Sequence, residues 1–362
     1  MTDAVLIGVD RPLTEAYDLA LLDLDGVVYI GANAVPHAPE ALARARDGGM
    51  TLRFVTNNAS RPAGTVAEHL TELGVPTAQD EVVTSAMAAA AMLAQRFPPD
   101  SPILVVGGEG LYWALRREGL RPVGAMADDP VAVVQGFSPD IGWRLLAEGT
   151  WAVRSGLPWI ATNTDLTVPT PHGPAPGNGT LVHAVRVAAD VEPEIAGKPR
   201  PALFRTAVDQ AGARRPLVVG DRLDTDLEGA RAAGLPGLLV LTGVCGASGA
   251  VAARPHERPS LLGADLRSLF EPHPEPRRLE PTQGRGFSWG CRASRVTAAD
   301  GRIEVDDAGD DPVDLLRAAC AAAWEVTDAG DARRSSDDSD GTDTTELIDA
   351  LLGFPGTEGW AR

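Results

Sequence analysis

The stretch DLALLDLDGVVY at residues 18–29 places two aspartates, Asp23 and Asp25, at the end of a short apolar run. The run Leu19–Leu24 predicts a buried strand, which Gly26 ends. Ligands in open parallel sheets bind at the carboxyl ends of the strands, and residues i and i+2 of a strand share a face. We therefore expect both carboxylates to line one site, where their repulsion favours a shared cation. Taken alone, the pattern also fits a turn with two solvated acids.

Two later stretches repeat the pattern of an apolar strand that ends in polar residues. LRFVTNNAS at residues 52–60 ends its apolar part at Thr56, and LVVGDRLDTD at residues 217–226 places Asp221 directly after a glycine. If Asp23 and Asp25 were only solvated acids in a turn, the same strand-end pattern would not be expected at two other places in the chain. The three strand ends together favour one site at the edge of a parallel sheet.

A fourth stretch, IAGKPRP at residues 195–201, contains Lys198, the only lysine of the chain; every other strongly basic side chain is an arginine. A compact, flexible ammonium and a planar guanidinium are not interchangeable where a point charge must reach a phosphate oxygen. A single lysine could occur anywhere by chance, but its position in this motif favours a functional role.

The four motifs D-L-D-G-V, V-T-N-N, G-K-P and G-D-R-x-x-T-D occur in this order and without substitution. In this the chain resembles the haloacid dehalogenase (HAD) superfamily of phosphatases, in its NagD-like, 4-nitrophenylphosphatase-type branch (subfamily IIA). The resemblance covers roughly residues 17–262. It implies an α/β fold: a Rossmann-like parallel-sheet core with a large inserted α/β cap domain, followed here by a small C-terminal α+β appendage.

The resemblance also implies an activity. We expect a Mg²⁺-dependent phosphatase that hydrolyses a small phosphomonoester through an aspartyl-phosphate, with glycerol 3-phosphate as the first candidate substrate. The alternatives are 2-phosphoglycolate and other small sugar or polyol phosphates. A non-catalytic regulatory protein on the same scaffold is a further alternative, although loss of Asp23 or Lys198 would have signalled it and both are present.

Roles for the aspartates follow from the chemistry of phosphoryl transfer and the resemblance. Asp23 is the expected nucleophile, and Asp25 the expected acid that protonates the leaving group and later activates water. Mg²⁺ prefers oxygen ligands, which would be an Asp23 carboxylate oxygen, the Asp25 backbone carbonyl and Asp221. Asp226 is expected to hold the waters of the metal.

The remaining site residues are expected to bind the substrate. Phosphoryl oxygens would be held by the Gly26 amide, Thr56, Asn57 and Lys198. The segment ATNTDLTVPTPHGPAPGNG at residues 161–179 is a long loop by composition, and loops of this length are often functional. By resemblance its T-N-x-D part approaches the substrate, which singles out Asn163 and Asp165. Turn capping by short polar side chains is the competing interpretation.

The length of 362 residues predicts two or three domains. We expect the following bounds: residues 1–82 with 191–262 as the HAD core, 83–190 as the cap that sets specificity, 263–283 as a Pro-rich linker, and 284–362 as a small C-terminal region with a flexible acidic segment at 328–345. In the C-terminal region Ser294–Val296, Arg302–Val305 and Val313–Ala323 suggest a β-β-α unit. An acyltransferase-like module is an alternative, but the acyl-CoA turn R-x-x-G-x-G/A does not follow Val296, so we expect a structural or dimer-forming part.

The net charge of −18 argues against nucleic acid or an anionic membrane as a partner. A small phosphorylated metabolite must then be attracted by local positive charge. The three cysteines lie far apart with no C-x-x-C pair, and no apolar run is long enough to span a membrane. We expect a cytoplasmic enzyme, and a homodimer is the assembly that we consider.

Overall fold

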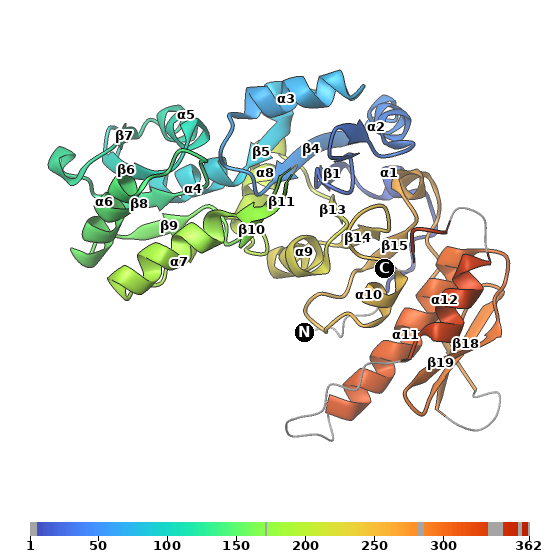
Figure 1. Ribbon diagram of the computed structural model, residues 1–362. Coiled ribbons are helices and arrows are strands. Elements are labelled where there is room, and N and C mark those ends of the chain that lie inside the picture. Colours follow the sequence, from blue (N-terminus) through green and yellow to red (C-terminus); the bar gives the residue numbers. More distant parts are fainter. Residues whose placement is uncertain (1–5, 171, 281–285, 332–342, 354–356, 361–362) are drawn as a thin grey trace. The chain divides into compact units, whose positions relative to one another are not determined.

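The computed structural model divides into two compact units (Figure 1). The first unit contains residues 1–52 and 213–362, and the second contains residues 53–212. The structure describes residues 6–170, 172–280, 286–331, 343–353 and 357–360.

The first unit contains a parallel sheet with the strand order β15-β14-β13-β1. Its strands are β1 (Leu19–Leu22), β13 (Pro216–Gly220), β14 (Gly237–Val240) and β15 (Leu261–Gly263). All four residues of β1 are buried, which is typical of a strand covered on both faces. β1 and β13 pair in a register that sets Leu22 beside Val219, so the segments that follow the two strands start side by side.

Short helices precede, connect and follow these strands. They are α1 (Leu13–Ala16), α2 (Ala38–Asp47), the π-helical turn η3 (Leu223–Leu227), α9 (Glu228–Ala233), α10 (Ala247–Val251) and the 3₁₀ helix η4 (Leu266–Phe270). The residues after β1 include a small hairpin of β2 (Tyr29–Ile30) and β3 (Asn33–Ala34).

The C-terminal part of the first unit is a four-stranded antiparallel sheet in the order β16-β17-β18-β19 with a long helix. The elements are β16 (Arg277–Leu279), β17 (Phe287–Cys291), β18 (Ser294–Ala299), β19 (Arg302–Asp307), α11 (Pro312–Asp331) and α12 (Thr345–Leu352). The predicted β-β-α unit corresponds to β18, β19 and α11, and the prediction missed the strands β16 and β17. β16 is short and polar and follows a Pro-rich stretch, and β17 contains a glycine, so neither gives a clear apolar signal.

The segment predicted as a linker is built into the fold where the structure describes it. It contains η4 and β16, and His273 forms a backbone bridge with Val9. His273 is also buried, with 2 % of its surface exposed. Of the acidic segment predicted to be flexible, residues 332–342 lie outside the described residues.

Helix α11 packs against the parallel sheet through one shared hydrophobic core. This core includes Leu239 and Leu262 from the sheet and Leu316, Cys320 and Trp324 from the helix. The C-terminal part and the sheet of the first unit thus bury apolar surface together.

Polar contacts reinforce this packing. The Trp324 indole N–H donates to the Ala250 carbonyl at 3.2 Å. The guanidinium of Arg258 lies over the Trp324 ring and makes two 2.8 Å bonds to Asp328.

The second unit contains a five-stranded parallel sheet in the order β12-β9-β8-β6-β7. Its strands are β6 (Pro102–Val106), β7 (Arg121–Val123), β8 (Ala132–Gln135), β9 (Trp159–Ala161) and β12 (Glu194–Ile195). Its helices are α5 (Glu109–Arg117), the 3₁₀ helix η2 (Met126–Asp128), α6 (Trp143–Arg154) and α7 (Asn178–Ala189).

The segment 161–179, predicted as a loop, contains an antiparallel hairpin of β10 (Thr167–Thr170) and β11 (Gly173–Pro176). Its last two residues begin α7, a helix that the sequence analysis did not predict. The Pro- and Gly-rich composition concealed both elements, because these residues are poor predictors of strands and helices.

The second unit also contains the strand–helix elements that carry the V-T-N-N and G-K-P motifs. They are β4 (Thr51–Thr56), whose first two residues belong to the first unit, α3 (Ala63–Glu72), η1 (Gln79–Glu81), β5 (Val82–Thr84), α4 (Ser85–Ala94) and α8 (Ala202–Ala211). β4 and β5 pair in parallel.

In the described part of the chain, no helix combines the length and apolarity needed to cross a bilayer.

Candidate active site

Three carboxylates gather at the carboxyl ends of β1 and β13 in the first unit. Asp23 follows β1, Asp221 follows β13, and Asp226 lies in the turn η3. One carboxylate oxygen from each lies within 4.8 Å of the other two. Asp221 and Asp226 are almost fully buried, at 1 % and 0 % exposure. Three negative charges at this separation and burial repel strongly, so the cluster favours a bound cation.

Asp221 is held by the segment that follows β14. The Val244 amide donates to Asp221 Oδ2 at 2.7 Å, and the Cys245 amide donates to the Asp221 carbonyl at 3.0 Å. Thr242 of the same segment donates to the Gly26 carbonyl at 2.5 Å. Gly26 has a φ of 81°, and a Cβ there would overlap the Asp221 carboxylate. Glycine is thus required both by the backbone and by the close approach of the acid.

Asp226 is positioned by the tight turn after β13. Its Oδ2 accepts a 3.2 Å bond from the Arg222 amide, which bends the chain back on itself. The turn places two acids that are five residues apart on the same side of the strand end. This is how the G-D-R-x-x-T-D motif delivers both carboxylates to one site.

The residues present fit Mg²⁺. The donor set consists of carboxylate oxygens, which are the ligands of hard cations such as Mg²⁺ and Ca²⁺ rather than the nitrogen and sulfur that zinc prefers. Mg²⁺ is held by one or two carboxylates and keeps several waters. The three clustered acids supply enough such ligands.

The thiol behind this cluster is not a candidate nucleophile. Burial raises the pKa of Cys245 to about 12, and the negative charge of Asp221 is the second-largest cause of this shift. The thiol is therefore neutral near pH 7, where a nucleophilic cysteine has to be a thiolate.

A second group of predicted site residues gathers around Asn57 in the second unit. Asn57 Oδ1 accepts from the Lys198 amide at 2.8 Å, and its Nδ2 donates to the Lys198 carbonyl at 3.2 Å. The Asn57 carbonyl accepts from Asn163 Nδ2 at 2.8 Å and from Ser85 Oγ at 2.6 Å. Asn57 therefore fixes the backbone on both sides of Lys198 and is itself fixed by two further side chains.

Lys198 is 4 % exposed, and its ammonium lies 3.5 Å from the Val55 carbonyl at the end of β4. The preceding Gly197 has no room for a side chain, since a Cβ would overlap Asn57 Oδ1 and the Thr162 carbonyl. The G-K segment thus lies directly against the V-T-N-N strand end. Thr56, 7 % exposed, is on that strand end and accepts the Asn58 amide through its hydroxyl at 3.1 Å.

The T-N-x-D residues also lie at Asn57. Both carboxylate oxygens of Asp165 are 3.4 Å from Asn57 Nδ2, and the Asp165 amide donates to Asn163 Oδ1 at 3.1 Å. Asn163 is 4 % exposed and accepts at its carbonyl from Asn178 Nδ2 at 2.8 Å. These contacts favour a positioning role for Asn163 and leave Asp165, which is half-buried, more accessible.

The structure thus brings the predicted residues together in two groups. Asp23, Asp221 and Asp226 lie together in the first unit, and Thr56, Asn57, Asn163, Asp165 and Lys198 lie together in the second. The carboxylate of Asp25 is exposed and lies outside the group of three acids. Its backbone pairs with Tyr29 instead.

Sequence reasoning missed several supporting residues: Ser85, Asn178, Thr242 and Val244. Ser85 and Asn178 begin helices α4 and α7. The T-G pair that follows strand β14 repeats the pattern of a strand ending in small polar residues. That pattern could have pointed to Thr242 and Val244.

Comparison with known proteins identifies the family. The model of the haloacid dehalogenase-like hydrolases matches residues 20–121, and a second HAD-hydrolase-like model matches residues 195–269. The D-glycerol 3-phosphate phosphatase of Mycobacterium tuberculosis is 44 % identical over 317 residues, which are 87 % of this chain and 88 % of that protein. The chain belongs to the haloacid dehalogenase-like hydrolases.

Solved structures agree with this assignment. The hydrolase is similar to the glycerol phosphate phosphatase of M. tuberculosis, solved in complex with magnesium, with a TM-score of 0.79 and 42 % identity over 87 % of this chain and 93 % of that one. A p-nitrophenyl phosphatase from Archaeoglobus fulgidus has a TM-score of 0.65 and 29 % identity, covering 70 % of this chain and 98 % of that chain. The expected HAD family, its 4-nitrophenylphosphatase-type branch and the parallel-sheet α/β fold are confirmed.

A third model, a GCN5-related N-acetyltransferase-like domain, matches residues 291–347 of the hydrolase. This match corresponds to the acyltransferase-like alternative that the sequence analysis set aside in favour of a structural or dimer-forming part. The acyl-CoA turn R-x-x-G-x-G/A remains absent from the sequence after Val296.

Proposed function

We propose that this hydrolase is a Mg²⁺-dependent phosphatase that hydrolyses a small phosphomonoester, with glycerol 3-phosphate as the preferred substrate. The observation that carries the proposal is the 44 % identity, over 87 % of the chain, to the D-glycerol 3-phosphate phosphatase of M. tuberculosis. The three-carboxylate cluster and the relative's crystal structure with magnesium support Mg²⁺ as the cofactor.

In the proposed mechanism Asp23 attacks the phosphorus and forms an aspartyl-phosphate, while the leaving alkoxide takes a proton from Asp25. Asp25 then accepts a proton from the water that hydrolyses the aspartyl-phosphate. The exposed position of Asp25, outside the group of three acids, suits a group that must exchange protons with substrate and water. Asp23 and Asp221 would hold Mg²⁺ together with the Asp25 carbonyl, and Asp226 would hold its waters. The bound ion would neutralise charge on the phosphoryl oxygens.

The second group would bind the phosphoryl oxygens. Lys198 supplies a positive charge. The Asn57 side chain fixes its position by binding the backbone amide and the backbone carbonyl of Lys198. Thr56 and the Gly26 amide would donate further hydrogen bonds. This local positive charge matters because the chain carries a net charge of −18, which repels an anionic substrate.

We further propose the predicted division of labour: residues 1–82 with 191–262 perform the chemistry, and residues 83–190 select the substrate. Four of the five strands of the sheet in the second unit, β6, β7, β8 and β9, lie within residues 83–190, which supports an independent cap. A homodimer is proposed as well, supported by Trp143 and Trp151, which are 79 % and 52 % exposed on α6. The three cysteines are buried free thiols, in keeping with a reducing, cytoplasmic location.

A phosphate-release screen tests the proposal. The protein is assayed with glycerol 3-phosphate, 2-phosphoglycolate and a set of sugar phosphates, each with Mg²⁺ and with excess chelator. We expect the highest kcat/KM for glycerol 3-phosphate and no activity in chelator. Full activity in chelator would refute the metal assignment, and a higher kcat/KM for another phosphomonoester would refute the substrate assignment.

A further inference from the structure

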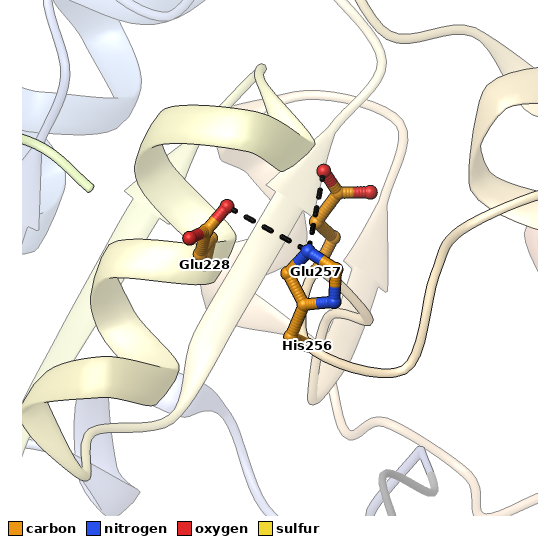
Figure 2. Close-up of side chains that lie close together, drawn as sticks. All are labelled: Glu228, His256 and Glu257. Atoms are coloured by element: carbon orange, nitrogen blue, oxygen red, sulfur yellow. Dashed lines mark ion pairs between the residues drawn. The ribbon is translucent and has the colours of Figure 1, made fainter.

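A second cluster of potential metal ligands lies in the first unit, on residues to which the proposed phosphatase assigns no role. Glu228, His256 and Glu257 each direct one ligand atom toward the others, within 4.8 Å (Figure 2). Glu228 is the first residue of α9, and the other two residues follow α10. Unlike the three aspartates, this cluster contains an imidazole.

The distances within the cluster are those of ligands around an ion rather than those of hydrogen bonds. His256 Nε2 lies 4.0 Å from Glu228 Oε2 and 3.9 Å from Glu257 Oε1. Hydrogen bonds between such groups are shorter, at roughly 2.7–3.2 Å. Ligands at about 2.1 Å from a tetrahedral zinc ion are about 3.4 Å apart. The two contacts of His256 would therefore contract by about half an ångström around such an ion, and the two carboxylates, whose ligand atoms lie within 4.8 Å of each other, would adjust with them.

The imidazole is available for such an ion. Within the described part of the chain, the His256 side chain makes no hydrogen bond. Its polar contacts are the two longer ones to Glu228 and Glu257. Its side chain is 54 % exposed, so an ion and its remaining waters can approach from solvent. An imidazole between two carboxylates is a donor set for zinc and similar divalent transition metals, whereas Mg²⁺ takes oxygen ligands.

The ligand Glu257 is already held in place. Its side chain is only 6 % exposed, and the guanidinium of Arg254 binds both carboxylate oxygens, with Nε 2.9 Å from Oε2 and Nη2 on Oε1. Next to it, Arg258 is tied to Asp328 of α11. Such outer contacts orient metal ligands before the ion binds. The positive charge of Arg254 opposes a cation and therefore lowers the expected affinity for the ion.

We propose that Glu228, His256 and Glu257 bind a divalent transition-metal ion of the zinc type. The ion ties the segment after α10 to the first residue of α9, two residues beyond Asp226. This site is separate from the all-oxygen site of the three aspartates and does not depend on the proposed phosphatase activity.

Calorimetry with Zn²⁺ tests the proposal. Zn²⁺ is titrated into the full chain in a large excess of Mg²⁺, which occupies the all-oxygen site. We expect one Zn²⁺ per chain, with a Kd raised at least tenfold by His256→Gln and by Glu228→Gln. The matched control is His183→Gln, which removes another exposed histidine, on α7, and should leave the Kd unchanged.

Thermal unfolding gives a second readout. A ligand that binds only the folded chain raises Tm, so Zn²⁺ should raise the Tm of the parent and of His183→Gln but not that of His256→Gln. Both ligand variants alter exposed or half-exposed side chains, and their Tm without zinc should match the parent. Absence of Zn²⁺ binding up to millimolar concentration would overturn the proposal. Binding that persists unchanged in His256→Gln would overturn it as well, because the ion would then be elsewhere.

Discussion

Lys198 is the residue whose chemistry can be tested most directly. Its ammonium is on a segment that Asn57 and Gly197 fix tightly, and 4 % of the residue is exposed. We expect Lys198→Arg to lower kcat/KM for glycerol 3-phosphate by about a hundredfold or more, because the larger planar guanidinium cannot take the same position. Steady-state phosphate release measures the loss.

The control is an arginine-to-lysine substitution at a nearby exposed position. Arg200→Lys changes an exposed side chain two residues further on and should leave kcat/KM within about twofold of the parent, as is usual for exposed positions. An activity of Lys198→Arg within about threefold of the parent would show that only the charge matters.

Asp23 and Asp25 can be separated by the leaving group. Asp23→Asn removes the nucleophile and should abolish turnover of every substrate. Asp25→Asn should slow glycerol 3-phosphate strongly, because its alkoxide needs a proton as the P–O bond breaks. With 4-nitrophenyl phosphate, whose leaving group needs none, we expect a burst of nitrophenolate of up to about one equivalent per site, followed by a slow steady state. Stopped-flow absorbance measures the burst.

A burst from Asp23→Asn alone would reverse the two assignments. Absence of a burst from both variants, with each folded and metal-bound, would contradict the proposed covalent route through Asp25 as acid and base.

At the scale of elements, the segment that carries the T-N-x-D residues combines a structural and a selective part. Asn163 is buried and bonded to the Asn57 carbonyl, so Asn163→Ala should lower Tm and reduce the rates of all phosphoesters alike. Asp165 is half-buried, and both of its carboxylate oxygens lie 3.4 Å from Asn57 Nδ2. Asp165→Ala should instead change the ratio of kcat/KM between glycerol 3-phosphate and 4-nitrophenyl phosphate.

Parallel kinetic and melting measurements on both variants distinguish these outcomes. Thr164→Ala, at the exposed position between the two residues, is the control and should change neither quantity. A selective effect of Asn163→Ala with unchanged Tm would contradict the structural role given to that side chain.

The elements that the sequence predicted are those with continuous apolar runs. β1 and β13 lie where the apolar run at residues 19–24 and the stretch at residues 217–226 predict them, because each is a short run of mostly buried aliphatic side chains. β10 and β11 escaped prediction because they contain prolines and exposed residues, and their pairing depends on a contact between strands rather than on local pattern.

The site was predictable to the extent that its residues are in motifs. Asp23, Lys198 and Asp221 each directly follow a strand or a glycine, and Thr56 is the last residue of β4. The structure places each of the four in one of the two groups. Asn178 carried no such signal. Its hydrogen bond to the Asn163 carbonyl arises only when the chain folds back at α7.

At the scale of the whole molecule, His273 couples stability to pH. It is buried, its Nε2 lies 2.9 Å from the Ser268 carbonyl, and its Nδ1 lies 3.1 Å from Arg317 Nη2. Burial, and after it the charges of Arg317 and Arg292, lowers the pKa of His273 from 6.5 to about 4, although the hydrogen bond with the Ser268 carbonyl raises it. Below pH 6.5 the unfolded chain therefore binds a proton that the folded chain does not.

Stability contributed by neutral His273 should be fully present above about pH 6.5 and lost as the pH falls toward 4. The loss amounts to at most about 3 kcal/mol. Urea unfolding between pH 7.5 and 5 measures the slope, which should flatten in His273→Gln even if that variant is less stable throughout. The exposed His183→Gln should keep the parent slope, and an unchanged slope in His273→Gln would contradict the assignment.

The presence of one lysine in the whole chain has a practical consequence for covalent labelling. Apart from the terminal amino group, amine-selective reagents such as small anhydrides or pyridoxal phosphate with borohydride meet a single target, Lys198. Because that side chain is buried, acylation should be slow, and saturating inorganic phosphate should slow it further. One modified peptide in a mass spectrum would then report occupancy of the phosphoryl site, without any assay of turnover.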